Sequence, residues 1–337
     1  MQVRLSAAVA SLSILFAILW NLPDSPLSGA AYGQEATAIH ASYNGTAGFN
    51  LPIWVLESTD IGRKYGLQIK TSLIGGAQGV HALIGGSFQY SQTGLEHAIN
   101  AIAQGAEVIA LGTSEFGFPY KLVGRKGVSK PEHLKGGVIG VAAFGGTGIF
   151  AVRLALAKLG LSENDVKIIV AGNTSQRAIS LMVAGGLDAT VLSPPSLFKV
   201  EKAGLPVLFD IREFSEYPNS SLVTTKSRVE KNRDEVRRFV RAWAEAISFI
   251  KRRPQESQAI LRKYVRLDDP EIIQGTYKFY AEKLPRSPKV LAKDFAATAR
   301  LLKAYNPQMK TISYDQVFDM TFIDEMERDG FIQSLYR

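Results

Sequence analysis

The sequence predicts an α/β protein of two Rossmann-like lobes with mainly parallel sheets, joined by a two-segment hinge and followed by a helical C-terminal extension. Three observations predict this class. Short apolar runs alternate with helical patterns from residue 38 to residue 210. The stretch 78–91 has a counterpart at 176–189, since each reads as a helix, a Gly-Gly pair and a strand. After residue 225 the apolar spacing becomes helical, with prolines at the breaks.

The first part of the alternating pattern is expected to form one parallel sheet covered by helices on both faces. A small polar or glycine-rich loop follows each of its strands. Strands are expected at 38–43, 67–73, 88–91 and 107–111. Helices are expected at 53–64 and 95–103, with a further helix between the second and third strands that ends at residue 84.

A second alternating series follows an interruption at 117–122 and an extended piece at 120–125. Beyond the strand that begins at Val138, it predicts helices at 149–159, 175–184 and 195–203 and strands at 166–171, 187–192 and 206–210. A return crossing is expected near 214–219. Further helices are predicted at 230–251, 254–265, 269–284, 288–304 and 314–328. The expected division is therefore a signal peptide at 1–33, lobe 1 at 34–119 and 220–337, and lobe 2 at 120–219.

The N-terminus has the pattern of a secretory signal. Arg4 precedes an uncharged apolar run at 5–20, and small residues follow, with cleavage expected after Ala30 or Gly33. Sixteen apolar residues are short for a membrane-spanning helix, and no later stretch is closer to that length. We expect an exported protein that is soluble and periplasmic after cleavage.

Composition excludes several classes of function. The net charge is +8, and most of the excess lies in residues 222–337, where 23 basic residues are interleaved with 16 acidic ones. This pattern is typical of solvated helix faces, and no aromatic–basic motif for nucleic acid accompanies it. There is no cysteine, and the four histidines lack metal-ligand spacing. We expect no nucleic-acid partner, no metal site and no cofactor.

The stretch 138–148 reads as a short apolar strand, a loop of small residues and the start of an amphipathic helix. The first N–H groups of a helix lack intrahelical acceptors, and the helix dipole adds partial positive charge there. Thr147 is placed either to cap this helix or to offer its hydroxyl to a ligand. The loop is therefore a candidate anion seat. The alternative is that its glycines only make the turn.

A series of short motifs carries a family resemblance. They are Tyr65-Gly66-Leu67, Gly75-Gly76, the segments 82–86, 134–141, 159–166 and 183–189, and Ser193-Pro194-Pro195. In this order and spacing the chain resembles the nitrate/sulfonate/taurine-type substrate-binding proteins of ABC importers. The resemblance implies a type II-like periplasmic binding protein fold, with a ligand site built from the strand-end loops of both lobes.

The resemblance and the strand-end rule for α/β sheets together suggest the ligand-binding residues. The expected set is Asn44, Gly45, Gly75, Gly76, Thr93 and Ser114 from lobe 1, Gly146, Thr147, Gly148, Asn173, Thr174 and Ser193 from lobe 2, and Tyr217 at the crossing. Three further residues are weaker candidates. Glu115 is placed to bind an amine, Arg177 to pair with an anionic group, and Phe144 to form an apolar wall.

The sequence departs from the family pattern in two places. The family's Asp after the Gly-Gly pair is present as Asp188, whereas its counterpart in lobe 1 is Gln89. The loop at 145–148 is Gly-Gly-Thr-Gly where relatives often show Gly-Ser. A related fold carries out pyrimidine synthesis with a cysteine-rich motif, which this chain lacks. No nucleophile–base arrangement is evident, so we expect no enzyme activity.

The expected function is that of an exported, monomeric solute-binding protein. It would capture a small anionic or zwitterionic ligand, such as a sulfonate, nitrate or organic acid, and deliver it to an inner-membrane permease with its ATPase. Two alternatives remain open: a periplasmic sensing module of a signalling system, and a binder of a pyrimidine-like or aromatic molecule.

Overall fold

The computed structural model describes residues 36–213, 217–305 and 311–337. The expected signal peptide and both of its cleavage positions lie outside the described residues. No helix of the described part is long and apolar enough to cross a membrane.

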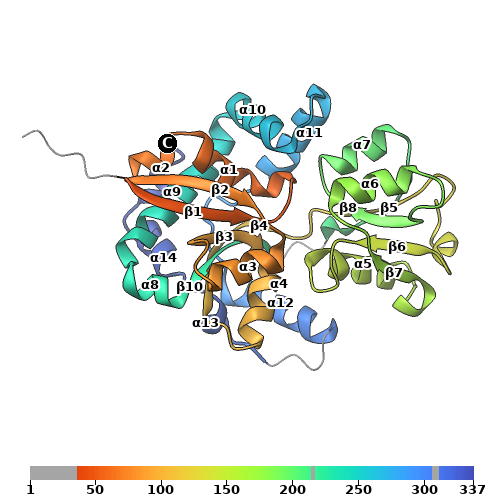
Figure 1. Cartoon of the computed structure of the whole chain (residues 1–337), viewed down its shortest axis with the longest axis horizontal. Helices are drawn as coiled ribbons and strands as arrows, with labels where there is room; N and C mark the ends of the chain where they lie inside the picture. Colours follow the sequence, from red (N-terminus) through yellow and green to blue (C-terminus); the bar gives the residue numbers. More distant parts are fainter. Residues whose placement is uncertain (1–35, 214–216, 306–310) are drawn as a thin grey trace, which may run out of the picture. The chain divides into compact units, whose positions relative to one another are not determined.

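The first sheet has five strands in the order β2-β1-β3-β10-β4. Strands β1, β2 and β3 are mutually parallel, whereas β10 runs antiparallel to both of its neighbours. The strands are β1 (Thr37–Tyr43), β2 (Leu67–Leu73), β3 (Tyr90–Gly94), β4 (Val108–Phe116) and β10 (Pro218–Thr225). Figure 1 shows the first four in red to orange.

The second sheet repeats the plan of the first. Its order is β7-β6-β8-β5-β9, with β6 parallel to β7 and β8, and β5 antiparallel to β8 and β9. The strands are β5 (Lys121–Gly124), β6 (Val138–Val141), β7 (Lys167–Val170), β8 (Ala189–Leu192) and β9 (Val207–Asp210). In each sheet the antiparallel strand is the one that directly follows a crossing from the other sheet. The predicted fold class, two α/β lobes with mainly parallel sheets and a helical C-terminal region, is confirmed.

Helices connect the strands within each sheet and then make up most of the remaining chain. Those of the first sheet are α1 (Leu51–Ser58), α2 (Ile61–Lys64), α3 (Gly76–Ile84) and α4 (Leu95–Ala103). Those of the second are α5 (Thr147–Lys158), α6 (Thr174–Met182) and α7 (Ser196–Lys202). The C-terminal helices are α8 (Lys226–Lys231), α9 (Arg233–Arg252), α10 (Pro254–Val265), α11 (Pro270–Ala281), α12 (Ala292–Tyr305), α13 (Tyr314–Val317), α14 (Thr321–Arg328) and α15 (Phe331–Ser334).

The main error of the sequence prediction concerns strand β10. The return crossing was expected near 214–219, no strand was expected between it and the helices after residue 225, and 92–94 and 112–115 were expected to be loops. In the structure β10 lies between β3 and β4 and pairs with both, which extends those two strands. Ser114 and Glu115 therefore belong to β4, and Thr93 belongs to β3, where Ser221 lies opposite it.

Several predicted helices are interrupted, because one to three residues leave the helical conformation. The helix expected at 53–64 divides into α1 and α2 at Thr59, which is extended. The one expected at 230–251 divides at Asn232 into α8 and α9, and the one at 314–328 divides into α13 and α14. The predicted strand at 88–91 begins at Tyr90 instead.

The departure at Gln89 has a simple structural explanation. Asp188 Oδ2 accepts the backbone N–H of Val138 at 2.7 Å, which holds the start of β6 to the second sheet. Gln89 Oε1 accepts the backbone N–H of His40 at the same distance in the first sheet. A neutral amide oxygen thus replaces the carboxylate in the same role. Asp188 has a second partner, Arg125 Nε at 2.8 Å, which accounts for the charged residue there.

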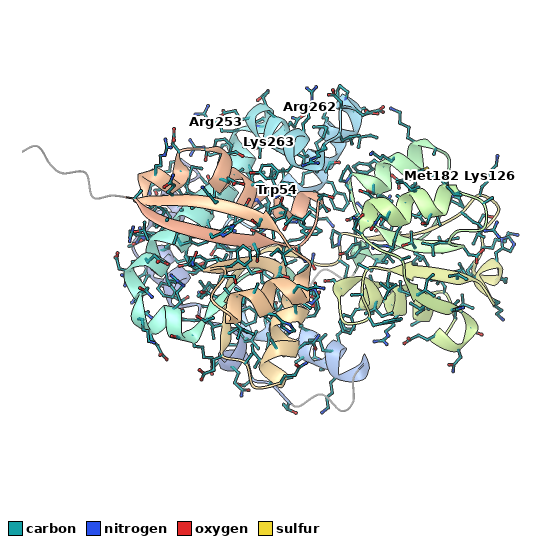
Figure 2. All side chains as sticks on the ribbon, viewed as in Figure 1. Trp54, Lys126, Met182, Arg253, Arg262 and Lys263 are labelled. Atoms are coloured by element: carbon teal, nitrogen blue, oxygen red, sulfur yellow. The ribbon has the colours of Figure 1, made fainter. Side chains whose placement is uncertain are left out.

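Helices α9 and α10 present different surfaces. The apolar side of α9 is fully buried, with Phe239 stacked on Tyr90 of β3 at 3.8 Å between ring centroids. Figure 2 shows Arg262 and Lys263 on the outer side of α10, whereas Trp54 of α1 lies inside. The C-terminal helices therefore cover the apolar core that lies against the first sheet.

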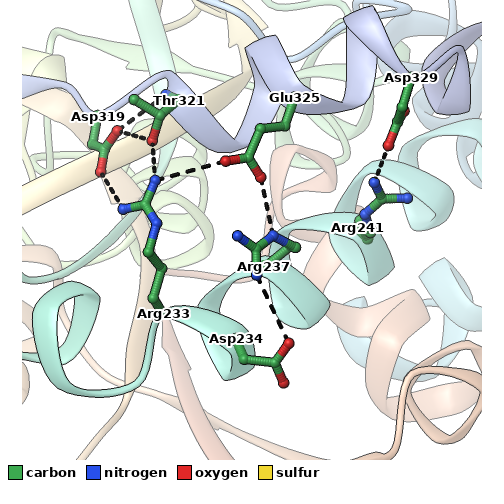
Figure 3. A network of polar contacts seen from close by, with 8 residues as sticks. All are labelled: Arg233, Asp234, Arg237, Arg241, Asp319, Thr321, Glu325 and Asp329. Carbon is green, nitrogen blue, oxygen red and sulfur yellow. Dashed lines mark hydrogen bonds and ion pairs between the residues drawn. The ribbon is translucent and has the colours of Figure 1, made fainter.

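Several basic residues of α9 are paired with acidic residues near the C-terminus. Arg237 Nε lies 3.0 Å from Glu325 Oε2 of α14, and Arg241 pairs with Asp329 (Figure 3). Arg233 donates to Thr321 Oγ1 at 2.9 Å. Because the three arginines recur every four residues, they share one side of α9. The side of α9 that faces α14 is thus an ion-paired surface.

We expect Arg237→Ala to lower the free energy of unfolding by about 0.5–1 kcal/mol, the usual size for a partly exposed pair. Salt should reduce this loss, because ions screen exposed charges. Urea unfolding at low and high salt measures both effects, with Arg300→Ala on α12 as the control. A loss that is unchanged by salt would contradict the electrostatic explanation.

Candidate functional site

The two segments that connect the sheets are bound to each other. The backbone N–H of Gly117 donates to the carbonyl of Tyr217 at 2.6 Å. The rings of Phe118 and Tyr217 are stacked, with centroids 4.7 Å apart. Both rings are buried. The crossing is therefore a packed region in which side chains of both sheets can meet.

The first-sheet candidates lie at strand ends and at the start of a helix. Asn44 and Gly45 follow β1, and the carbonyl of Gly45 accepts Asn50 Nδ2 at 2.8 Å. Gly75 and Gly76 form the N-terminus of α3. A β-carbon at Gly76 would lie 2.1 Å from His97 Nε2, so a larger residue there would have to displace the His97 ring. Ser114 donates to the carbonyl of Ser220 at 3.2 Å.

The second-sheet candidates lie at the starts of two helices and after one strand. Gly146 is the N-cap of α5, which begins with Thr147 and Gly148. Asn173 is the N-cap of α6, which begins with Thr174. Ser193 follows β8 and is fully buried.

A carboxylate of the first sheet occupies the N-terminus of α5. Glu96 Oε1, from α4, accepts the backbone N–H of Thr147 at 2.8 Å and its hydroxyl at 2.6 Å. Glu96 Oε2 accepts the hydroxyl of Tyr217 at 2.9 Å. Glu96, Thr147 and Tyr217 are all buried. The candidate anion seat therefore holds an anion that belongs to the protein, and this contact joins the two sheets and the return crossing.

The structure changes one expectation at this helix and adds one residue, Glu96, to the site. The capping interpretation of Thr147 is wrong, since Gly146 is the N-cap and the Thr147 hydroxyl donates to Glu96. Glu96 itself was not among the expected site residues. Its position gave one usable signal, an acidic residue in the first helical turn after the Gln92-Thr93-Gly94 strand end. Its neighbours on α4 also approach the loop, since Asn100 Nδ2 lies 3.4 Å from the carbonyl of Gly145.

Glu115 is the second buried acid at the crossing. Its Oε2 accepts Asn219 Nδ2 of β10 at 2.6 Å, whereas its Oε1 has no hydrogen-bond partner. Burial raises the pKa of Glu115 from 4.5 to about 8, against smaller opposing effects of Asn219 and Lys283. The free protein therefore holds Glu115 mainly as the neutral acid at pH 7.

Tyrosines connect Glu115 with the loops of both sheets. Tyr280 of α11 donates to the carbonyl of Pro194 at 3.3 Å, and its ring lies 6.2 Å from that of Phe49. Burial raises the pKa of Tyr280 well above 10, and the charge of Glu115 adds to this effect. Tyr120, between the sheets in sequence, is within electrostatic range of Glu115, Glu96 and Arg177. These side chains form one polar group around the crossing.

Two weaker candidates have other surroundings in the structure. Arg177 is buried, and it donates to Thr190 Oγ1 at 3.0 Å and to the carbonyls of Gly172 and Val191 at 2.6 and 3.2 Å. It thus holds α6 to its own sheet, and burial lowers its pKa to about 10. Phe144 is 60% exposed, so it does not form a packed wall here.

Buried polar atoms without a hydrogen-bond partner coincide with the expected site. In the described part of the chain, nine side-chain atoms have this property, and four belong to residues expected from the sequence. These four are Asn44 Oδ1, Thr93 Oγ1, Glu115 Oε1 and Ser193 Oγ. Leaving a buried polar group unpaired is costly, so each of these four atoms needs an explanation.

The side chains of the candidate site do not suggest a bound metal ion. Among the described residues, no group of three or more histidine, cysteine, aspartate or glutamate side chains could hold an ion. The polar atoms at the crossing are mostly hydroxyl and amide groups, which suit an organic ligand.

Solved structures share this fold of two α/β lobes. One is a protein of Bordetella bronchiseptica RB50, with a TM-score of 0.77 and 21% identity over 88% of this chain and 98% of that chain. Another is the alkanesulfonate-binding protein SsuA of Xanthomonas axonopodis pv. citri bound to MOPS, with a TM-score of 0.69 and 17% identity over 85% and 99% of the two chains.

The family model described as NMT1/THI5 like matches residues 64–257, and the chain belongs to this family. A putative binding protein of Brucella abortus (strain 2308) is 27% identical over 212 residues, which are 61% of this chain. The match spans 64% of that relative, less than two thirds of its length. The resemblance to nitrate/sulfonate/taurine-type binding proteins is confirmed at the level of family and fold.

Proposed function

We propose that this chain is an exported solute-binding protein that takes a small ligand between its two sheets and delivers it to an inner-membrane ABC permease with its ATPase. The observation that carries the proposal is the set of unpaired buried atoms of Asn44, Thr93, Glu115 and Ser193. They belong to loops and strand ends of both sheets, the region where open α/β sheets bind ligands. Family membership and fold support the same reading.

The two segments that connect the sheets suggest how the ligand is captured. Two connecting segments allow the sheets to open and close by hinge motion. In the open form a small molecule could reach the unpaired hydroxyl, amide and carboxyl groups. Closure would then pair those groups with the ligand, which offsets the cost of their burial. We take the ligand to be anionic or zwitterionic, as the sequence suggests, and the protein to act as a periplasmic monomer without a cofactor.

Binding without turnover is the simplest role for this chemistry. The Thr147 hydroxyl donates to a carboxylate whose other oxygen is held by Tyr217. The whole sequence contains no cysteine that could serve as a nucleophile. We therefore infer a binding protein rather than an enzyme, and turnover of any bound solute would overturn this inference.

The unpaired hydroxyls provide a direct test. Thr93→Val keeps the shape of the side chain and removes an unpaired hydroxyl, so the ligand-free protein should be equally or more stable. The same change should abolish the rise in Tm that a bound solute causes. Thermal unfolding of the purified protein with a panel of sulfonates, carboxylates, oxyanions, amino acids and amines measures both.

Ser257→Ala is the matched control. Its hydroxyl is also buried and unpaired, but it lies in α10. This variant should keep every ligand-induced rise in Tm. If Thr93→Val keeps them too, or if no solute raises Tm in the wild-type protein, the proposed site is wrong. A separate experiment distinguishes transport from a sensing role: a strain that lacks the gene should lose uptake of the solute if the protein acts in transport.

A further inference from the structure

Most of the positive charge of the C-terminal part lies in one short segment. Residues 251–266 contain six basic residues and one acidic residue, Glu256. They supply five of the seven net positive charges of residues 222–337. On α9, by contrast, Arg237 and Arg241 are paired with Glu325 and Asp329. The segment around α10 therefore holds most of the charge excess of this part of the chain.

Five of the six basic side chains are exposed together. Lys251 is the exception, since it is partly buried and its Nζ donates to the carbonyl of Ala281 at 2.9 Å. We call the other five the α10 basic surface: Arg252, Arg253, Arg262, Lys263 and Arg266. Figure 2 shows Arg253, Lys263 and Arg262 along one edge of the molecule. The opposite side of α10 is buried through Ser257, Ile260 and Leu261.

Acidic residues neutralise little of the α10 basic surface. Arg253 pairs with Glu256 at 3.6 Å, and Arg262 pairs with Asp268. All four of these side chains are more than half exposed, and such pairs are weak. Within the described ranges, the ion pairs include none of the other three residues, Arg252, Lys263 and Arg266. Most of the charge is thus available to an external partner.

Arg266 occupies a backbone position that favours glycine. It is the C-cap of α10, with φ of 51° and ψ of 50°. Among the residues that the structure describes, it is the one non-glycine residue with a positive φ. This left-handed conformation is unfavourable for a residue with a β-carbon, and helices commonly end in glycine there. The chain therefore keeps a cation at this place against the conformational preference, as expected if the charge has a use.

The surroundings of the charges favour one kind of anionic partner. None of the exposed large apolar side chains of the described chain lies in residues 251–266, whereas protein interfaces usually have an apolar centre. Single-stranded nucleic acids stack on free aromatic rings, but Tyr264 is already stacked on Trp54 at 4.8 Å between centroids. Dispersed cations without an apolar centre suit an anionic bilayer, where each charge adds to the attraction without a fixed geometry.

We propose that the α10 basic surface holds the protein electrostatically on a bilayer that contains anionic phospholipids. The inference rests on the proposed function for its setting, because an exported protein that delivers a solute to a permease works beside such a bilayer. Arg253 and Arg266 lie roughly 20 Å apart along α10, less than the Debye length of about 30 Å at low salt, so the charges act together. Binding is reversible, because no apolar side chain of this surface enters the acyl region.

Co-sedimentation with vesicles tests the attachment. Phosphatidylcholine vesicles with about one third phosphatidylglycerol should bind the protein at about 0.01 M salt and release it at about 0.5 M, since ions screen the charges. Vesicles of phosphatidylcholine alone measure any binding that does not depend on lipid charge, such as binding through the apolar run at 5–20. Equal binding to both vesicles at low salt overturns the proposal. The solute panel tests the proposed function separately, without lipid.

Two triple variants locate the binding. Replacing Arg262, Lys263 and Arg266 by glutamine should lower binding to the anionic vesicles at least tenfold, since each basic residue contributes about fivefold. The matched control removes the same charge by replacing three exposed lysines of the second-sheet part by glutamine: Lys126, Lys130 and Lys135. The control should retain most of the binding. An equal loss in both variants would show that net charge, not this surface, attracts the bilayer.

Arg266→Gly separates binding from folding. Glycine adopts the left-handed conformation readily, so Tm should stay equal or rise, while binding to the anionic vesicles should fall about fivefold. Unchanged binding would contradict a role for Arg266 in attachment. A short DNA duplex that binds more tightly than the vesicles at the same salt would assign the surface to a nucleic acid and overturn the proposal.

Discussion

Replacing Glu96 by alanine is expected to lower the free energy of unfolding by about 3 kcal/mol. The substitution leaves three buried donors without their acceptor: the N–H and hydroxyl of Thr147 and the hydroxyl of Tyr217. Each unpaired buried group costs roughly 1–3 kcal/mol. The start of α5 also loses a charge that its dipole favours. Chemical denaturation of the ligand-free protein measures the loss.

The same variant should open more easily, because water can satisfy the freed donors once the sheets separate. We expect a larger radius of gyration for Glu96→Ala by small-angle scattering in the absence of ligand. Glu96→Gln should show an intermediate loss, since its amide oxygen can still accept from Thr147. Glu132→Ala is the control. Unchanged stability and dimensions in Glu96→Ala would mean that Glu96 does not hold the sheets together.

Elements that pack against their neighbours in sequence were predicted well. The strand at 67–73 and the helix at 95–103 match the observed bounds, and the second-sheet elements agree within a few residues. Their apolar periodicity depends on burial in the local β-α-β unit, which the sequence displays directly. The Gly-Gly pairs at 85–86 and 185–186 mark corresponding positions in the two sheets.

Strand β10 could not be predicted in this way. Its partners β3 and β4 lie more than a hundred residues earlier in the chain. The segment is short and rich in serine and threonine, so it reads as a loop until those partners are known. Because of this long-range pairing, Ser114 and Glu115 lie in a buried strand, whereas the sequence predicted a loop. Glu115 is therefore buried, with Oε2 paired to Asn219 and Oε1 without a partner.

Glu96 illustrates a second limit. A glycine-rich loop before a helix indicates that an anion can bind there, but the loop does not say whose anion it is. The answer depends on how closely α4 approaches α5, which involves residues 51 positions apart. Unpaired atoms in the structure, by contrast, coincide with strand-end residues that the sequence had already suggested, including Asn44, Thr93 and Ser193.

The second large effect is expected in the pH dependence of stability, and it comes from Glu115. Its pKa rises from 4.5 to about 8 on folding, so between these values the folded protein binds more protons than the unfolded chain. The stability that the neutral acid contributes is fully present below pH 4.5 and is lost as the pH rises through 8. Each pKa unit corresponds to about 1.4 kcal/mol, so the loss is on the order of a few kcal/mol.

Glu115→Gln should remove this dependence, because a neutral amide cannot ionise. Near pH 5 the variant should be about as stable as the wild-type protein, and at pH 8 it should be more stable by a few kcal/mol. Urea unfolding of both proteins at several pH values gives the difference directly, and other titrating groups cancel from it. Glu132→Gln should follow the wild-type curve. A Glu115→Gln protein whose stability runs parallel to the wild type between pH 5 and 8 would show that Glu115 is ionised throughout, with a partner for its Oε1 already in place.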